Sequence, residues 1–171
     1  MKYPIILKYT YSYICSGNYY KPEVREYYQL FRNINDSTMV SLGAVTDIKV
    51  NVTEFNGEQI IFTYNYSKYC KPDTFDKKTE WVNNYYAIKK GEKVSIICVE
   101  MYWAYARGGE NSPANLTVEW VSYEEMLQEI FAEAEKDKYK AIKVANILIK
   151  EEIYDLAFKM LLSITINKRQ I

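Results

Sequence analysis

Glu100 is the carboxylate with the most unusual surroundings in this sequence. It lies within the otherwise uncharged run Ile96–Tyr105. Burial in such a run would raise the pKa of the carboxyl group and make it a candidate general acid. Pairs of carboxylates support divalent-metal-dependent hydrolysis of phosphodiesters and hydrolysis of glycosides. A carboxylate- and divalent-metal-dependent hydrolase or nuclease that uses Glu100 is therefore one hypothesis.

This enzymatic hypothesis is incomplete, because the sequence places no second carboxylate beside Glu100. An ion pair with a lysine or arginine of a neighbouring strand, or a position at a solvated edge, explains Glu100 more simply. The chain contains no histidine, which excludes serine–histidine and cysteine–histidine catalysis and histidine-ligated metal centres. It also lacks a glycine-rich phosphate-binding loop. We therefore expect no metal site and no cofactor, and we favour a protein that is not an enzyme.

The cysteines and the N-terminal residues indicate a compartment. Cys15, Cys70 and Cys98 are odd in number and far apart, which argues against a disulfide framework and favours a reducing environment. The apolar run Ile5–Leu7 ends at Lys8, and a secretory signal needs roughly 7–15 apolar residues. No stretch approaches the ~20 apolar residues of a membrane span. We expect a cytoplasmic protein without a membrane partner.

Tyrosine is the residue type that dominates the composition, with 18 tyrosines in 171 residues. A tyrosine supplies a large, stiff and amphipathic contact surface at low entropy cost, although most tyrosines in strands are half-buried packing residues. The clusters in the middle of the chain are the candidates for contact with a partner. The candidate partner-binding residues are Tyr64, Tyr66, Tyr69, Tyr85, Tyr86, Tyr102, Tyr105 and Arg107.

These features favour a non-enzymatic binding protein that occupies a protein partner with a tyrosine-rich surface. Size, composition and the missing motifs suggest a phage- or mobile-element-encoded inhibitor of a host defence enzyme. A single-stranded nucleic-acid-binding module is a further alternative, because lysine follows or precedes tyrosine at Lys8–Tyr9, Tyr20–Lys21 and Lys68–Tyr69, and aromatic rings stack on bases. The equal numbers of basic and acidic residues, 22 of each, do not favour nucleic acid. The oligomeric state is open.

The elements that must position these side chains change in type near Ser122. All glycines, prolines and tryptophans and 15 of the 18 tyrosines precede Ser122. No glycine or proline, the residues that interrupt helices, follows it. We expect an α+β fold: an antiparallel sheet of about five to seven strands in residues 1–121, followed by two or three helices in residues 122–171 that pack on this body as one domain.

Alternation of apolar residues predicts the individual strands. Asn56–Gly57 separates two alternating runs and predicts a hairpin. We expect a turn at residues 90–92 and one long strand over residues 40–52. An apolar run on both faces predicts a central, doubly covered strand over residues 94–105. Residues 107–113 are expected to form a loop. Residues 22–32 fit a strand or a short helix, and we favour the helix.

The helical region begins with a capping box, because Ser122 is followed by Glu125. Three apolar stripes at helical spacing predict the buried sides of the helices. The stripes are Met126, Leu127, Ile130, Phe131 and Ala134, then Tyr139, Ile142, Ala145, Leu148 and Ile149, then Ile153, Ala157, Met160, Leu161 and Ile164. Residues 138–164 could form one long helix or a hairpin. Residues 124–137 contain six acidic residues and one lysine, whereas residues 138–150 contain four lysines and no acidic residue.

Overall fold

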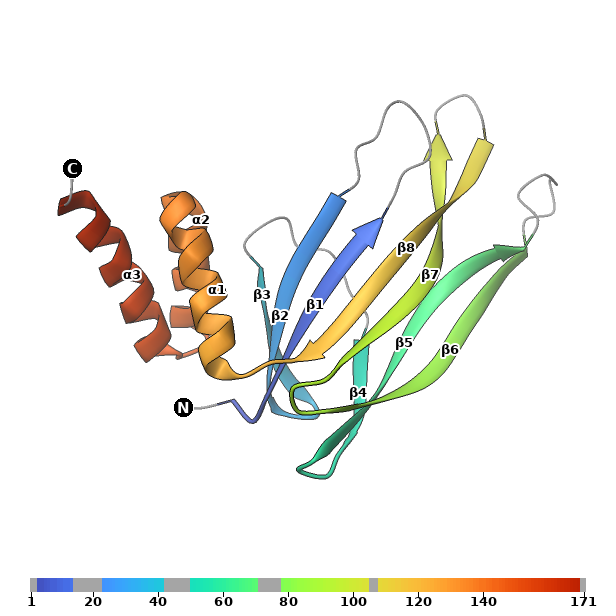
Figure 1. Ribbon diagram of the computed structural model, residues 1–171, viewed down its shortest axis with the longest axis horizontal. Helices are drawn as coiled ribbons and strands as arrows, with labels where there is room; N and C mark the ends of the chain where they lie inside the picture. The colour runs from blue at the N-terminus through green and yellow to red at the C-terminus, as the bar shows by residue number, and fades with distance from the viewer. Residues whose placement is uncertain (1–2, 14–22, 42–49, 71–77, 105–107, 170–171) are drawn as a thin grey trace. The chain divides into compact units, whose positions relative to one another are not determined.

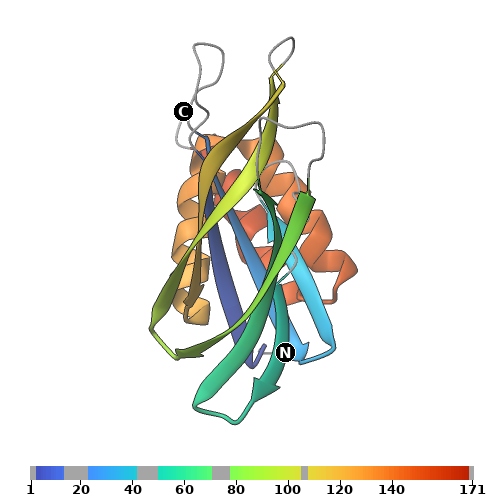
Figure 2. The same ribbon diagram turned by 90° about the vertical axis from the view of Figure 1, so that its right-hand side faces the viewer.

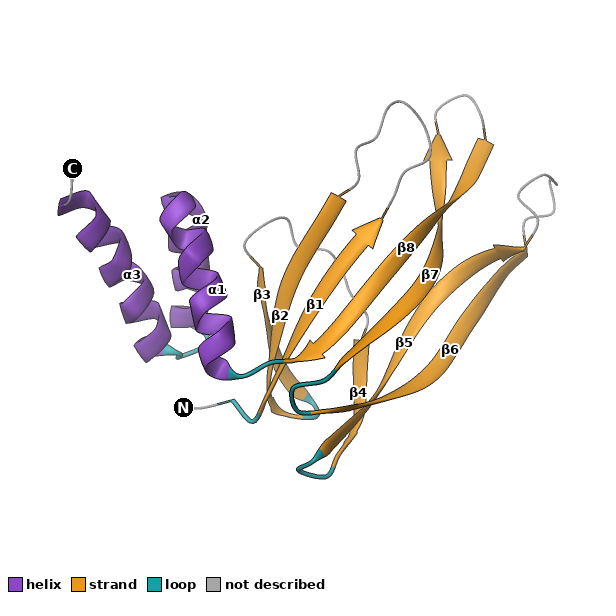
Figure 3. Ribbon diagram, in the orientation of Figure 1, coloured by secondary structure: helices purple, strands orange, loops and turns teal. Residues whose placement is uncertain are grey.

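The computed structural model describes residues 3–13, 23–41, 50–70, 78–104 and 108–169 of the chain (Figure 1). These residues form eight strands followed by three helices (Figure 3). The strands are β1 (Ile5–Tyr13), β2 (Glu23–Asn33), β3 (Asp36–Ser41), β4 (Val50–Phe55), β5 (Gln59–Cys70), β6 (Lys78–Lys89), β7 (Lys93–Ala104) and β8 (Gly108–Trp120). The helices are α1 (Tyr123–Lys136), α2 (Lys138–Lys150) and α3 (Tyr154–Arg169). The predicted α+β class is confirmed.

The strands form two antiparallel sheets. One sheet has five strands in the order β3-β2-β1-β8-β7, and the other has three strands in the order β4-β5-β6. The chain folds into two compact units. The first comprises Met1–Lys8, Glu26–Thr46 and Trp120–Ile171, and the second comprises Tyr9–Arg25 and Asp47–Glu119.

Two tight turns lie at the predicted positions. Gly57 has a φ of 92°, and the side chain of Asn56 accepts a hydrogen bond from the backbone N–H of Gln59 at 2.8 Å, so the β4–β5 hairpin is confirmed. Gly91 has a φ of 84° between β6 and β7, where the N–H of Glu92 donates to the carbonyl of Lys89 at 3.0 Å. Both positions need glycine, because other residues rarely adopt a positive φ.

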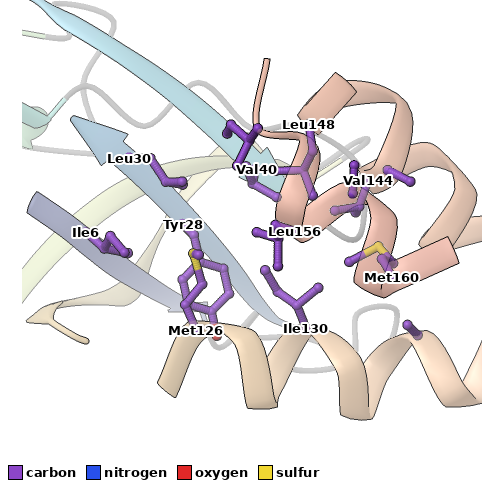
Figure 4. Close-up of a cluster of buried hydrophobic side chains, with 14 of the residues drawn as sticks. Ile6, Tyr28, Leu30, Val40, Met126, Ile130, Val144, Leu148, Leu156 and Met160 are labelled. Carbon is purple, nitrogen blue, oxygen red and sulfur yellow. The ribbon is translucent and has the colours of Figure 1, made fainter. Parts of the chain in front are cut away.

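The helices of the first unit pack on β1, β2 and β3 around one apolar core (Figure 4). Strand side chains meet side chains from all three helices there. The buried cluster includes Ile6, Tyr28, Leu30, Val40, Met126, Ile130, Val144, Leu148, Leu156 and Met160. At the junction between sheet and helices, the N–H of Val121 donates to the carbonyl of Ile6 at 3.0 Å. The prediction of two or three C-terminal helices is confirmed.

Local chemistry sets the ends of the helices. The Ser122 side chain accepts a hydrogen bond from the N–H of Glu125, which confirms the predicted cap. Asp137 caps α2 in the same way, because its carboxylate accepts from the N–H groups of Tyr139 and Lys140. Glu152 has a φ of 63° and ends the second helix before α3. Residues 138–164 are therefore two helices and not one.

Several sequence-based expectations about the strands were wrong. The favoured helix over residues 22–32 is strand β2. Of the long strand expected over residues 40–52, the first two residues belong to β3 and the last three to β4, which lie in different sheets, and residues 42–49 lie outside the described residues. Strand β7 lies at the end of the five-stranded sheet and is not central. Residues 108–113 belong to β8, where Pro113 pairs with Val99, and do not form a loop.

Among the helices of the described chain, none combines the length and the apolar character needed to cross a membrane.

Candidate partner-binding surfaces

The register of β5 and β6 defines a first candidate surface. Tyr85 lies opposite Thr63, and Ala87 lies opposite Ile61. Directly opposite residues of an antiparallel pair point to the same side of the sheet. We call these four residues, Ile61, Thr63, Tyr85 and Ala87, the hairpin face.

Tyr85 is the exposed aromatic residue of the hairpin face. Its side chain is 72 % exposed, Ala87 is exposed and Ile61 is half-buried. The cross-strand neighbour Thr63 is buried. Tyr85 therefore offers almost a whole ring to a partner, and burying an aromatic ring of this size is the kind of contact that dominates protein interfaces.

The adjacent residue Tyr86 lies on the opposite side of the strand pair. Its ring stacks on Phe62 with 5.4 Å between the ring centroids. Tyr64 and the fully buried Ile60 share this side, and Tyr64 is only 7 % exposed. Tyr64 is thus buried in the second unit and Tyr86 is half-buried on the same side, whereas Tyr85 faces solvent.

For the other candidate residues, the described part of the chain gives the backbone position alone or nothing. Tyr66 pairs with Val82 and Tyr69 with Thr79 in the β5–β6 ladder. In the β7–β8 ladder, Tyr102 pairs with Glu110 and Glu100 with Ser112. The side chains of Tyr66, Tyr69, Glu100 and Tyr102, and the whole of Tyr105 and Arg107, lie outside the described residues.

A second candidate surface lies on α3 and was missed by the sequence analysis. Tyr154, Phe158 and Leu162 recur every four residues and therefore lie on one side of the helix. Their side chains are 60 %, 63 % and 41 % exposed. The same helix buries Leu156 and Met160 on its other side. We call Tyr154, Phe158 and Leu162 the α3 face.

Helix α2, which contacts α3, also exposes apolar side chains. Tyr139 is 74 % exposed, and Ile142 and Ile149 are each more than a third exposed. These three residues were predicted to lie in the buried stripe of the helix, and that part of the prediction was wrong. The buried side of α2 is formed by smaller residues, namely Ala141, Val144, Ala145 and Leu148. Alanine lets the helix lie close to its neighbours, so the bulkier side chains are left outside.

Helix α1 is fastened to α3 by a polar contact. The Tyr123 hydroxyl donates a hydrogen bond to the Asp155 carboxylate at 3.0 Å. Partial burial and the neighbouring carboxylates of Asp155 and Glu124 raise the pKa of Tyr123 to about 12. The neutral phenol is therefore the form that this contact favours.

An ion pair links helix α1 to the sheet. Lys8 Nζ lies 2.7 Å from Glu129 Oε2 and 3.9 Å from Glu26 Oε1. The Tyr28 hydroxyl donates a hydrogen bond to the same Glu129 oxygen, and Lys8 Nζ lies 6.0 Å from the centre of the Tyr28 ring. These contacts satisfy polar groups where the helix covers the sheet, so they have a structural explanation.

Arg32 links strand β2 to the C-terminal end of helix α2. Its guanidinium donates to the carbonyl of Glu151 at 2.7 Å and lies 5.6 Å from the centre of the Tyr3 ring. The carbonyl belongs to the C-terminal cap of α2, where a cation is favourable.

In the part of the chain whose side chains are described, no group of three or more Cys, Asp or Glu side chains is arranged to hold a metal ion.

Comparison of the chain with protein-family models, with curated proteins and with solved structures found no match.

Proposed function

We propose that this protein is a non-enzymatic binding protein that captures a protein partner through the hairpin face. The observation that carries the proposal is the exposure of Tyr85, a large aromatic side chain that is 72 % exposed in a strand whose other side is packed. Exposed tyrosines of this kind are enriched at the centres of protein interfaces.

The neighbourhood of Tyr85 supports this role. Ala87 beside it is small and exposed, and Ile61 adds partly exposed apolar surface. A partner that covers the ring also meets polar and charged neighbours on the same side of the sheet, because Asn51 lies opposite Thr63, Glu54 lies opposite Ile61 and Lys89 follows Ala87 by two residues. The backbone of the hairpin is held by a continuous register from Gln59–Lys89 to Cys70–Lys78, so the ring is presented by a rigid element.

The finer proposal is that the partner is a host defence enzyme and that the protein is a phage- or mobile-element-encoded inhibitor. It rests on size, composition and missing motifs alone. Inhibition by occupancy would need no catalytic group in this chain.

Partner capture with two matched variants tests the proposal. Tagged wild type, Tyr85→Ala and Glu58→Ala are each used as bait in host lysate, and captured proteins are quantified by mass spectrometry. Glu58 is exposed in the β4–β5 turn of the same sheet, so its variant controls for surface change alone. We expect a protein that wild type and Glu58→Ala recover equally and that Tyr85→Ala recovers at least tenfold less. Equal recovery by all three baits would reject the hairpin face.

A further inference from the structure

The α3 face lies between two helices of opposite charge. Helix α3 contacts both α1 and α2. Figure 1 shows α3 on the outer side of the other two helices, and Figure 2 shows α1 and α2 on either side of it. The hydrogen bond from Tyr123 to Asp155 fixes which flank of α3 is turned toward α1.

The flank formed by α1 is acidic. Glu124 and Glu135 are exposed, and their spacing of eleven residues places them on the same side of the helix. The flank formed by α2 is basic. Lys143 and Lys150 are exposed, and their spacing of seven residues places them on one side of α2 together with the exposed Tyr139. Within the described residues, none of these four charged groups forms an ion pair.

We propose that the α3 face joins two copies of this chain in a symmetric dimer. The surface that has to be covered is apolar at its centre and carries opposite charges on its two sides. A second copy offers the same apolar centre and the same two charges. It is therefore complementary to this surface in both respects.

Symmetry decides how the two copies would meet. A two-fold axis parallel to α3 places α3 beside α3 and puts the acidic α1 of each copy opposite the basic α2 of the other. A two-fold axis that crosses α3 within the interface plane puts α1 against α1 and α2 against α2, so that like charges meet. Opposite charges attract and like charges repel across an interface, and only the parallel axis is compatible with both flanks.

The size of the apolar surface suits a dimer. An aromatic side chain contributes about 150–250 Å², so the exposed parts of Tyr154 and Phe158 on α3 offer roughly 200–300 Å², and Tyr139 on the flank formed by α2 offers roughly 100–200 Å² more. Ile142, Ile149 and Leu162 add to this area. A typical monomer exposes no patch larger than about 300–600 Å², and a standard interface covers about 800 Å² on each partner. The apolar centre with its charged flanks approaches that area.

Other occupants fit the charges less well. An anionic membrane surface or an acidic protein would attract the α2 lysines, but it would be repelled by Glu124 and Glu135 on the other flank. A basic partner would be repelled by α2. These occupants are therefore outcomes that the test must be able to reveal.

Sedimentation velocity of the full chain at concentrations up to about 100 µM, where micromolar dissociation constants are readily detected, is the first test. We expect wild type to sediment with twice the mass of one chain and Phe158→Ser to sediment as a monomer. Phe158 is 63 % exposed, so its replacement leaves the fold intact. Tyr85→Ser, which removes an equally exposed ring from the other unit, is the matched control and stays dimeric.

Charge reversal is the second test. The acidic variant carries Lys143→Glu and Lys150→Glu, and the basic variant carries Glu124→Lys and Glu135→Lys. Each alone brings like charges together and is expected to dissociate at least tenfold more readily than wild type. An equal mixture restores opposite charges at both contacts between flanks, because every flank of the acidic variant then meets a basic flank, and a tag on one variant lets the mixed dimer be isolated.

The results separate the possible occupants. Dimerisation lost in Phe158→Ser and recovered in the charge-reversed mixture supports the proposal. A wild type that stays monomeric at every concentration overturns it, and binding of this monomer to vesicles of anionic lipid would assign the face to a membrane surface. A Phe158→Ser variant as dimeric as wild type, or charge variants that each dimerise as well as wild type, would also overturn it. The hairpin face belongs to the other unit, so the result of the capture experiment with Tyr85→Ala does not depend on the result of the dimer test.

Discussion

Glu129 links helix α1 to the sheet, and replacing it with alanine should measurably destabilise the fold. The carboxylate accepts from the Lys8 ammonium at 2.7 Å and from the Tyr28 hydroxyl. The Lys8 side chain is only 13 % exposed, so its charge is poorly solvated when the carboxylate is removed. Glu26 remains, but its carboxylate lies 3.9 Å from Lys8 Nζ.

The expected cost of Glu129→Ala lies between two limits. Removing one partner of a fully buried ion pair costs about 3–5 kcal/mol, and a fully exposed pair contributes about 0–1 kcal/mol. Glu129 is 44 % exposed while Lys8 is nearly buried. We therefore expect a loss of about 2 kcal/mol in the free energy of unfolding, which includes the lost hydrogen bond from Tyr28. For a domain of this size, that loss lowers Tm by about 4–8 °C.

Urea denaturation followed by circular dichroism measures this loss. Glu135→Ala on the same helix is the matched control, because Glu135 is exposed and makes no ion pair among the described residues, and its effect should stay within about 0.5 kcal/mol. Adding Lys8→Met removes the charge that Glu129 neutralised, so the double variant should be less destabilised than the sum of the two single variants by about 1 kcal/mol. A Glu129→Ala protein as stable as the Glu135→Ala control would refute this reasoning.

Three further predictions concern the helical layer. Leu148→Ala should lower the free energy of unfolding by about 2–5 kcal/mol, because Leu148 is fully buried in the core of the first unit; a urea titration that gives less than about 1 kcal/mol would contradict this packing. Asp137→Ala should cost about 1 kcal/mol, because it removes the acceptor for two N–H groups at the start of α2, whereas Asp137→Asn should cost much less in the same titration. The folded-state pKa of Tyr123 is raised to about 12, so its contribution to stability is complete below about pH 10 and is lost as the pH rises toward 12. Wild type should therefore be more stable than Tyr123→Phe at pH 8, and the difference should shrink between pH 10 and 12 in parallel denaturation curves; a constant difference would contradict the assignment.

The parts of the fold that were predictable are those governed by local chemistry. Asn56–Gly57 and the turn at Gly91 were identified because a positive φ strongly favours glycine at these sites. Ser122 was identified because a side-chain oxygen three residues before a glutamate suits the first helical amides. These signals depend on neighbouring residues only, so they remain valid whatever the rest of the chain does.

Strand β2 was mistaken for a helix because both of its faces are covered. Tyr27, Tyr28, Leu30 and Phe31 are all buried. A strand buried on both sides has no alternation of apolar and polar residues, and its apolar positions then match a helical spacing equally well. Pairing with β3 makes this segment a strand. It joins residues such as Tyr28 and Val40, and nothing in the sequence identifies these residues as partners.

The exposed side of the helical layer was unpredictable for a related reason. Helices α2 and α3 are apolar on more than one side, so periodicity identifies several possible buried stripes. The structure selects the stripe with Ala141 and Ala145, because small side chains allow close packing, and it leaves Tyr139 and Ile142 outside. For the tyrosines of the β5–β6 hairpin, composition does not distinguish Tyr64, Tyr85 and Tyr86. Only the strand register separates the exposed Tyr85 from the buried Tyr64 and the half-buried Tyr86.

The most direct test of the account is the dissociation constant of the purified captured partner, measured by titration calorimetry with wild type and with Tyr85→Ala. An aromatic ring at the centre of an interface contributes about 2 kcal/mol or more, so we expect the variant to bind at least about 30-fold more weakly at an unchanged Tm. Equal dissociation constants for the two proteins would show that the exposed ring of Tyr85 plays no part in binding and would contradict the proposed function.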